Sequence, residues 1–205
     1  VDMGSYRKDN KNFDAQRAGW FASILAEYKM DYFTPGILFW YASGDDSNAY
    51  NGSERMPVVE GSWTASSYGF DGNFGRDACD MIGLSNDGKM GVYLQAKDIS
   101  FMEDLTHVFR VGFVKGTNNT EMARHGGAAI HNDAVEPLGR QLYMTTADKA
   151  WEVNVDSEYK IYKNLSLFLE LGYINLDLDK GVWGKDADLY RENNVRGAVS
   201  LQYVF

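Results

Sequence analysis

The sequence predicts an all-β protein, a transmembrane antiparallel up-and-down β-barrel with short periplasmic turns and long external loops. Three observations predict this fold: side chains that alternate between an apolar and a polar face, connections that alternate between short and long, and a last strand that ends on an aromatic residue. Bacterial outer-membrane barrels combine these alternations of face and loop length. No run of about 18 apolar residues is present, which excludes a helical membrane protein.

The C-terminal segment 195–205 carries the clearest alternation. Since successive side chains of a strand point to opposite faces, every second residue belongs to one face. The apolar face consists of Val195, Gly197, Val199, Leu201, Tyr203 and Phe205. The polar face consists of Arg196, Ala198, Ser200 and Gln202. The length of the segment suits a tilted membrane-crossing strand. An apolar face toward lipid and a polar face toward a lumen would produce this pattern.

The rest of the chain divides into similar strands and into connections of two kinds. We expect strands over 15–30, 37–43, 89–100, 105–114, 151–161, 165–173 and 195–205, with a weaker one within 1–8. Short turns follow Met30, lie near 101–104 and lie at 163–164, whereas long loops cover 44–87, 115–148 and 177–193. The strand at 37–43 is apolar on both faces, and we expect Leu38, Trp40 and Ala42 to point outward.

Length, charge and cysteine content limit the classes of protein to which this chain can belong. A chain of 205 residues is expected to form one domain, here residues 1–205. A net charge of -9 argues against a nucleic-acid partner, and one cysteine, Cys79, excludes an internal disulfide framework. The segment Val1–Ser5 lacks the basic and apolar regions of a signal peptide. Because the chain starts within a possible strand, we expect a C-terminal fragment of a longer protein.

Several motifs resemble a known family. They are Tyr-Ala-Ser-Gly-Asp-Asp at 41–46, Asn-Gly-Ser-Glu-Arg-Met-Pro at 51–57, Glu-Tyr-Lys at 27–29, Thr-Pro-Gly at 34–36 and the terminal Gln-Tyr-Val-Phe at 202–205. They resemble the C-terminal half of the outer-membrane homotrimeric porins of sulfate-reducing bacteria. The resemblance implies a homotrimer of roughly sixteen-stranded barrels in the Gram-negative outer membrane, in contact with lipid and lipopolysaccharide, with water-filled lumens. Such channels pass small hydrophilic solutes or ions by passive diffusion. About eight strands are expected here, which is half of such a barrel.

Charged residues on the polar faces favour a wide lumen over a narrow one. A closed barrel of about eight strands is filled by its own side chains, whereas about sixteen strands leave a channel. Charges packed in a narrow interior would need nearly complete pairing. We therefore expect the following residues to line the pore and tune its selectivity: Arg17, Glu27, Lys97, Arg110, Glu152, Asp156, Glu158, Glu170 and Arg196.

Two alternatives stay open at this level. One is a small closed eight-stranded barrel with a structural or surface-binding role, in which the long loops act. The other is a soluble all-β binding protein such as a lectin-like sandwich, whose core would produce the same alternation of side chains.

The loop at 44–87 is a candidate constriction, since a long loop in a compact domain is usually functional. Folded inward, it would present Asp45, Asp46, Glu54, Arg55, Arg76 and Asp77 to the lumen. Folded outward, it would pack over the mouth or on a neighbouring subunit. We expect no other cofactor than a structural Ca²⁺, for which oxygen-rich Asp45, Asp46, Asp177 and Asp179 are candidates without EF-hand spacing.

An enzymatic function is not expected. The three histidines, His107, His125 and His131, belong to no His-Glu-x-x-His motif. The sequence also contains no Gly-x-Ser-x-Gly nucleophile motif.

Overall fold

The structure is a computed structural model that describes residues 5–8, 11–14, 18–48, 51–56, 65–67, 88–121, 144–184, 187 and 193–205. Its elements are β1 (Ser5–Lys8), β2 (Lys11–Asp14), β3 (Phe21–Glu27), β4 (Thr34–Ala42), β5 (Lys89–Met102), β6 (Leu105–Gly116), β7 (Lys149–Tyr162), β8 (Leu165–Asp177), α2 (Lys180–Trp183) and β9 (Asn193–Tyr203). None of the described helices is long and apolar enough to span a membrane. The chain is therefore all-β in its described part, as the alternation predicts.

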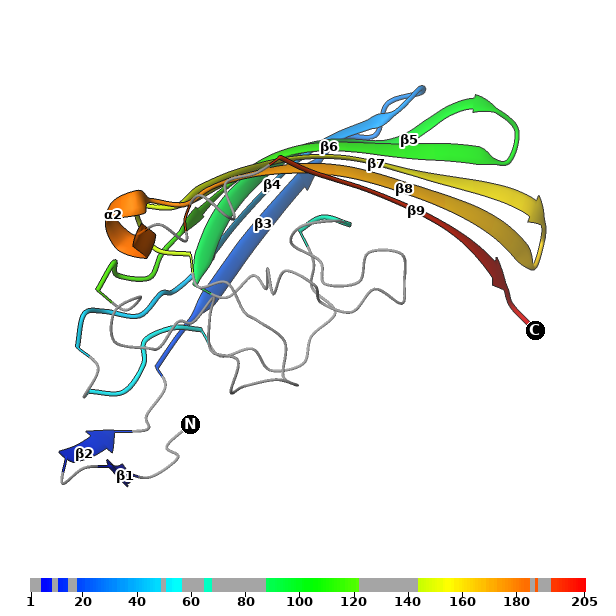
Figure 1. Cartoon of the computed structure of the whole chain (residues 1–205). Coiled ribbons are helices and arrows are strands. Elements are labelled where there is room, and N and C mark those ends of the chain that lie inside the picture. The colour runs from blue at the N-terminus through cyan, green and yellow to red at the C-terminus, as the bar shows by residue number, and fades with distance from the viewer. Residues whose placement is uncertain are drawn as a thin grey trace.

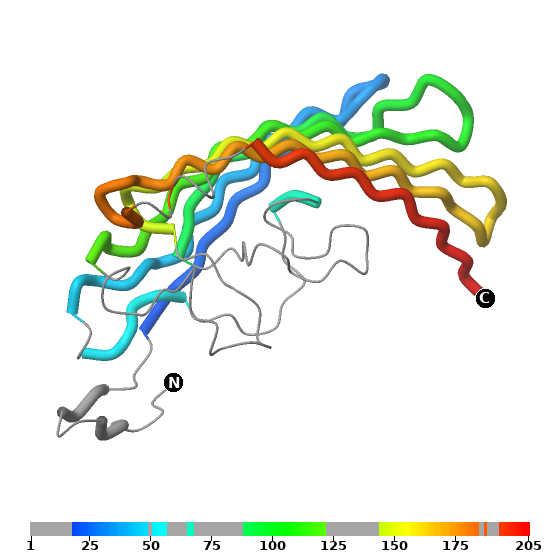
Figure 2. The backbone as a smooth tube through the Cα atoms, in the orientation of Figure 1, coloured from blue at the N-terminus to red at the C-terminus, as the bar shows by residue number. Residues whose placement is uncertain are grey.

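Strands β3 to β9 form one antiparallel sheet of seven strands, in which each strand pairs with its neighbours in the chain (Figure 1). The sheet is a curved trough, and the main chain runs up and down along it (Figure 2). Within the described residues, β3 pairs only with β4 and β9 only with β8, so the two edges do not meet. The up-and-down order is confirmed for seven strands.

The N-terminal region differs from the expectation. Strands β1 and β2 pair with each other in a separate two-stranded ladder. The expected polar loop after Lys8 thus contains a second short strand, Lys11–Asp14. The weak strand expected within 1–8 does not join the main sheet.

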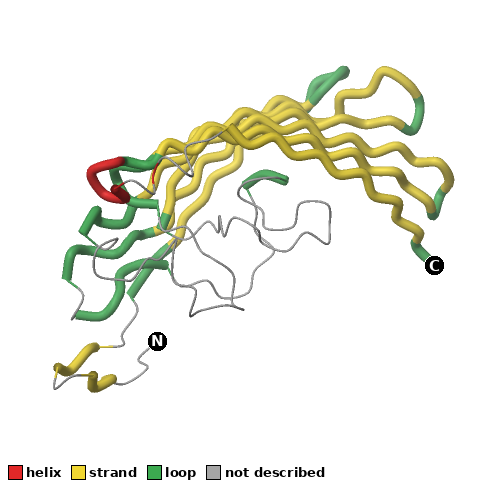
Figure 3. Tube along the Cα trace, viewed as in Figure 1, coloured by secondary structure: helices red, strands yellow, loops and turns green. Residues whose placement is uncertain are grey.

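The connections alternate in length as predicted. The short ones, after β3, β5 and β7, lie at the same end of the sheet as the C-terminus (Figure 3). There Val204 N donates to the carbonyl of Asn164, which ties the end of the chain to the β7–β8 turn. Asp104 has a φ of 63° in the β5–β6 turn, a left-handed conformation that aspartate tolerates in tight turns. Strands β4, β6 and β8 all end at the opposite end of the sheet, where the long connections begin.

The two faces of the sheet differ sharply. The convex outer face is an apolar band whose side chains remain exposed even where they are large: Ile24, Ile37, Phe39, Val92, Leu94, Phe109, Trp151, Leu167, Leu169, Leu171, Tyr173, Val195, Val199, Leu201 and Tyr203. Aromatic residues lie at both ends of this band. At the long-loop end the ring centroids of Phe113 and Trp151, and of Trp20 and Tyr41, are 4.7 Å apart, and at the short-turn end those of Tyr203 and Phe205 are 5.0 Å apart. The outer face therefore exposes large apolar side chains along its whole length.

The buried core lies on the concave inner face, toward the long loops. Its largest members are Trp40, Tyr93, Met144, Ile174 and Leu178, each at most 1% exposed. The expectation that Leu38, Trp40 and Ala42 point outward is wrong, because all three are buried on the inner face. Their outward-facing neighbours are Ile37 and Phe39, 47% and 45% exposed.

A close fit of rings over glycines explains the orientation of β4. Trp40 lies opposite Gly91 and stacks on Tyr93 with ring centroids 5.6 Å apart. A Cβ at Gly91 would lie 2.2 Å from the Trp40 ring, and one at Gly112 would lie 2.2 Å from the Tyr93 ring. The missing side chains leave room for the two aromatic rings on the inner face.

Candidate functional site

All the predicted pore-lining residues that the structure describes lie on the inner face. Strand register places them in order along the trough, and two neighbouring rows hold most of them. One row crosses the whole sheet as Glu27, Gly36, Gln95, Arg110, Asn154, Gly172 and Arg196. The adjacent row toward the short turns contains Lys97, Asp156 and Glu170. We call Glu27, Lys97, Arg110, Asp156, Glu170 and Arg196 the charged belt.

Ion pairs join residues of the charged belt across strands: one links β3 to β5 across β4, and another links the neighbouring strands β6 and β7. Lys97 Nζ lies 2.5 Å from Glu27 Oε1, and Gln95 donates to the same oxygen at 2.8 Å. Arg110 Nη1 pairs with Asp156 Oδ2 and donates to Asn154 Oδ1 at 3.3 Å. The paired side chains keep between 17% and 32% of their surface exposed, so water reaches them. Three acids face three bases in the belt.

Glu152 and Glu158 flank the belt on opposite sides. Glu158 is half-buried and accepts a hydrogen bond from Ser166 Oγ at 3.0 Å. Glu152 lies nearer the long loops, is fully buried, and accepts from the Tyr93 hydroxyl at 2.7 Å and from Asn154 Nδ2 at 2.6 Å. Arg17 lies outside the described residues.

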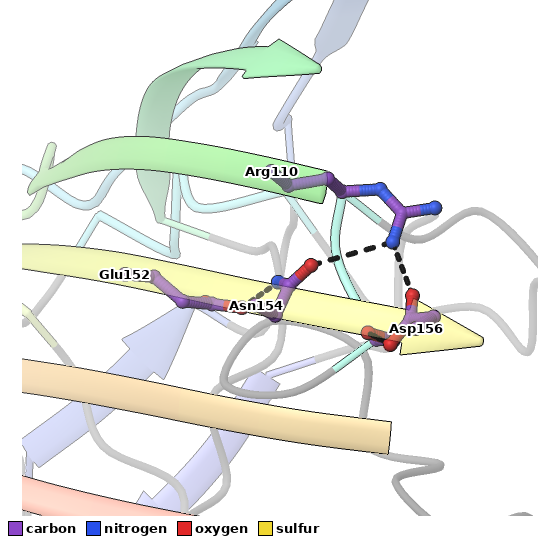
Figure 4. Close-up of polar contacts among 5 residues, drawn as sticks. Arg110, Glu152, Asn154 and Asp156 are labelled. Atoms are coloured by element: carbon purple, nitrogen blue, oxygen red, sulfur yellow. Dashed lines mark hydrogen bonds and ion pairs between the residues drawn. The ribbon is translucent and has the colours of Figure 1, made fainter. Parts of the chain in front are cut away.

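A continuous polar chain links these groups across three strands and a loop. Figure 4 shows Arg110 reaching from β6 toward Asn154 and Asp156 on β7, with Asn154 turned back toward Glu152. Ser67 adds the loop, because its hydroxyl donates to Asp156 Oδ1 at 2.6 Å. We call this set the inner-face network: Ser67, Tyr93, Arg110, Glu152, Asn154 and Asp156.

Part of the candidate constriction loop thus lies inside the trough. Ala65 and Ser66 are each 4% exposed, and the segment 65–67 lies on the concave side of the sheet (Figure 1). Arg76 and Asp77 lie outside the described residues. The other four candidates of this loop, Asp45, Asp46, Glu54 and Arg55, lie near the end of β4 rather than over the network.

Three of these four form a carboxylate cluster. Asp45, Asp46 and Glu54 each offer a carboxylate oxygen, and these oxygens lie within 4.8 Å of one another. Burial raises the pKa of Glu54 above its ordinary value, and the nearby Asp46 carboxylate raises it further. Arg55 follows Glu54, and its backbone N–H donates to Ser53 Oγ at 3.3 Å.

The other two predicted calcium ligands are engaged elsewhere. Asp179 caps α2, where its Oδ1 accepts from Gly181 N and Val182 N at 2.8 and 3.1 Å. Asp177 Oδ2 lies 3.4 Å from Lys149 Nζ. Among the described residues, neither aspartate joins a group of three metal-ligating side chains.

One histidine can be placed. His107 Nδ1 lies 2.8 Å from Ser157 Oγ on the neighbouring strand, and the His107 ring packs near Phe101 with centroids 5.7 Å apart. Serine hydrolases use the other ring nitrogen, Nε2, to face the serine, while Nδ1 faces the acid. The pair therefore reads as two polar side chains that satisfy each other on an apolar face. His125, His131 and Cys79 lie outside the described residues.

Three members of the inner-face network, Ser67, Tyr93 and Asn154, were not among the residues predicted from the sequence. Tyr93 and Asn154 stand in the polar phase of their strands, and Asn154 falls between Glu152 and Asp156, so alternation was the available signal. Ser67 has no such signal, because only the folded loop brings it to Asp156, 89 residues away in the chain.

Comparisons of the chain with protein-family models, with curated proteins and with solved structures find no match.

Proposed function

We propose that this chain forms part of the wall of an outer-membrane porin, a water-filled channel through which small hydrophilic solutes or ions diffuse passively. One observation carries the proposal: the exposed face of the sheet is apolar, and the sheltered face is charged. A soluble sandwich would show the reverse, because its apolar face would be covered by a second sheet. Large contiguous apolar patches are rare on soluble monomers.

The open edges support a larger closed barrel. In hydrocarbon, each unpaired backbone N–H and C=O costs several kcal/mol, so only a closed sheet is stable there. Within the described residues β3 and β9 do not pair with each other, which counts against a small barrel closed by these strands alone. We propose that further strands complete a barrel of roughly sixteen strands, and that three such barrels associate, as the resemblance implies.

The charged belt would then form part of the selective section of the lumen. Rings of carboxylates favour cations and rings of Arg or Lys favour anions. Because three acids oppose three bases in the belt, we propose that its selectivity between cations and anions is weak. The segment 65–67 is hydrogen-bonded to Asp156 through Ser67, and it would narrow the lumen beside the charged belt.

Single-channel conductance in planar bilayers under a salt gradient tests this function. The detergent-extracted protein should open in steps, grouped in threes for a trimer, with a reversal potential close to zero. Replacing Arg110 by Gln removes one belt cation and should shift the reversal potential toward cation preference. Lys163→Gln removes the same charge from the short β7–β8 turn and should leave it nearly unchanged.

Absence of conductance from a folded, membrane-inserted sample would contradict the proposed channel function. Its function would then have to reside in the long loops. If both wild type and Arg110→Gln conduct with the same reversal potential, the chain forms a pore, but the charged belt does not determine its selectivity.

A further inference from the structure

Three carboxylates converge where β4 leaves the sheet at the long-loop end. Asp45 and Asp46 follow the strand, and Glu54 returns to them from the segment 51–56. Their facing oxygens lie within 4.8 Å of one another. We propose that Asp45, Asp46 and Glu54 bind a divalent metal ion of the calcium type.

Two carboxylate oxygens of the cluster are buried and receive no hydrogen bond from an N–H group or a hydroxyl of the described residues. They are Asp45 Oδ1 and Glu54 Oε2. Asp45 is 9% exposed, and its other oxygen, Oδ2, accepts from Ser53 Oγ at 2.7 Å. A buried carboxylate oxygen without a partner is costly, since it has lost its water. A bound cation would offset the cost of burying both oxygens, because each could coordinate it.

The chemistry and the spacing suit calcium. Ca²⁺ takes oxygen ligands at about 2.3–2.6 Å, so one ion can join oxygens up to about 5 Å apart. Mg²⁺ requires about 2.0–2.1 Å and spans only about 4 Å, and it sheds its water reluctantly. Carboxylates that accept hydrogen bonds through one lone pair still offer another, as Asp46 does beside Asn48 N and Asn51 Nδ2.

The backbone around the cluster is already fixed. Ser43 Oγ donates to the Glu54 carbonyl at 2.7 Å, and Met56 N donates to the Ser43 carbonyl at 3.0 Å. On the other side, Asn119 N donates to the Asp45 carbonyl at 2.8 Å. The cluster therefore joins the end of β4, the segment 51–56 and the connection after β6. An ion held there would stabilise the long-loop end of the sheet by binding the folded state alone.

Calorimetric titration with CaCl₂ tests the site on the detergent-solubilised full-length protein after removal of metal with EDTA. We expect a single-site isotherm, weaker binding of MgCl₂, and a higher unfolding temperature in Ca²⁺ than in EDTA. Asp45→Asn and Glu54→Gln should each lower the Ca²⁺ affinity by at least about tenfold, since loss of even an outer partner of a metal ligand costs that much. Both substitutions keep the side-chain shape.

Asp31→Asn is the matched control, because Asp31 is an exposed carboxylate in the β3–β4 turn at the opposite end of the sheet. It should leave the affinity unchanged. No saturable binding by folded wild type at about 10 mM CaCl₂, above the range of weak extracellular calcium modules, would overturn the site. Equal affinities for wild type and Glu54→Gln, or equal losses in Asp31→Asn, would also overturn it.

Discussion

At the residue scale, the inner-face network shows how a charged group tolerates complete burial. Glu152 is fully buried, yet both of its oxygens accept hydrogen bonds, from Tyr93 and from Asn154. Asn154 in turn accepts from Arg110, which pairs with Asp156. Since buried polar groups are stabilising only when each is satisfied, we expect the network to be sensitive to the loss of any one member.

Tyr93→Phe tests this sensitivity with the least change in packing. The ring that stacks on Trp40 stays, while the hydrogen bond from the Tyr93 hydroxyl to Glu152 Oε2 is lost. We expect the free energy of unfolding to fall by about 1–3 kcal/mol, the usual effect of removing one partner of a buried hydrogen bond. Urea titration of the protein in lipid vesicles measures it.

Tyr32→Phe is the matched control, because Tyr32 is 86% exposed in the β3–β4 turn. Its unfolding free energy should remain that of wild type. If both variants lose the same amount, the hydroxyl of Tyr93 has no special role in stability.

At the element scale, pairing between strands decides which face of β4 is buried. The strand offers large apolar side chains on both faces, so its own sequence leaves the choice open. Gly91 and Gly112 on the next two strands leave space for Trp40 and Tyr93 on the inner face only. The orientation of β4 is thus fixed by glycines about 50 and 70 residues away.

Gly112→Ala tests this packing. The added Cβ would lie 2.2 Å from the Tyr93 ring, which is fully buried and cannot move aside. We expect a loss of about 1–3 kcal/mol in the free energy of unfolding, typical of overpacking. The same urea titration measures it.

Gly197→Ala provides the comparison within a strand of the same sheet. Its Cβ would lie 3.1 Å from Leu171 Cδ2, the mobile end of an exposed side chain. The change should stay within about 0.5 kcal/mol, as for most surface substitutions. Equal losses at the two glycines would show that close ring packing is not what constrains Gly112.

At the scale of the whole molecule, the sheet separates two environments. Its convex face exposes a continuous apolar band, and its concave face carries the charged belt and the segment 65–67. The polar pair His107 and Ser157 satisfies itself within the band. We therefore expect the convex face to contact lipid chains.

Quenching of tryptophan fluorescence by brominated lipids tests this contact. Trp151 is 52% exposed on the convex face, whereas Trp40 is fully buried on the concave face. In vesicles, Trp151→Phe should remove a clear share of the emission that brominated chains quench. Trp183→Phe, which alters a half-buried residue of α2 in the long connection after β8, should leave the quenchable share intact. Unchanged quenching in Trp151→Phe would mean that the band does not face lipid.

Local side-chain patterns are enough to predict the class of fold and much of the order of its strands. Alternating side chains predicted β3 and β5 to β9, and an apolar run predicted β4. Alternation also predicted the common face of Glu27, Lys97, Arg110, Asp156 and Glu170, because the period of two is a local property of extended chain. The alternation of short and long connections was predicted for the same reason, since turn residues act locally. The short helix α2 and the strand β2 fell within expected loops, where local signals are weak.

Contacts between residues far apart in the chain follow from strand register and from loop folding. Register between strands aligned Glu27, Arg110 and Arg196 in one row, and a slip of one residue would have moved whole strands to the other face. Loop folding brought Ser67 to Asp156 and Glu54 to Asp45. These contacts depend on the closing of long loops onto a finished sheet, and no local pattern in the sequence encodes where such a loop comes to rest.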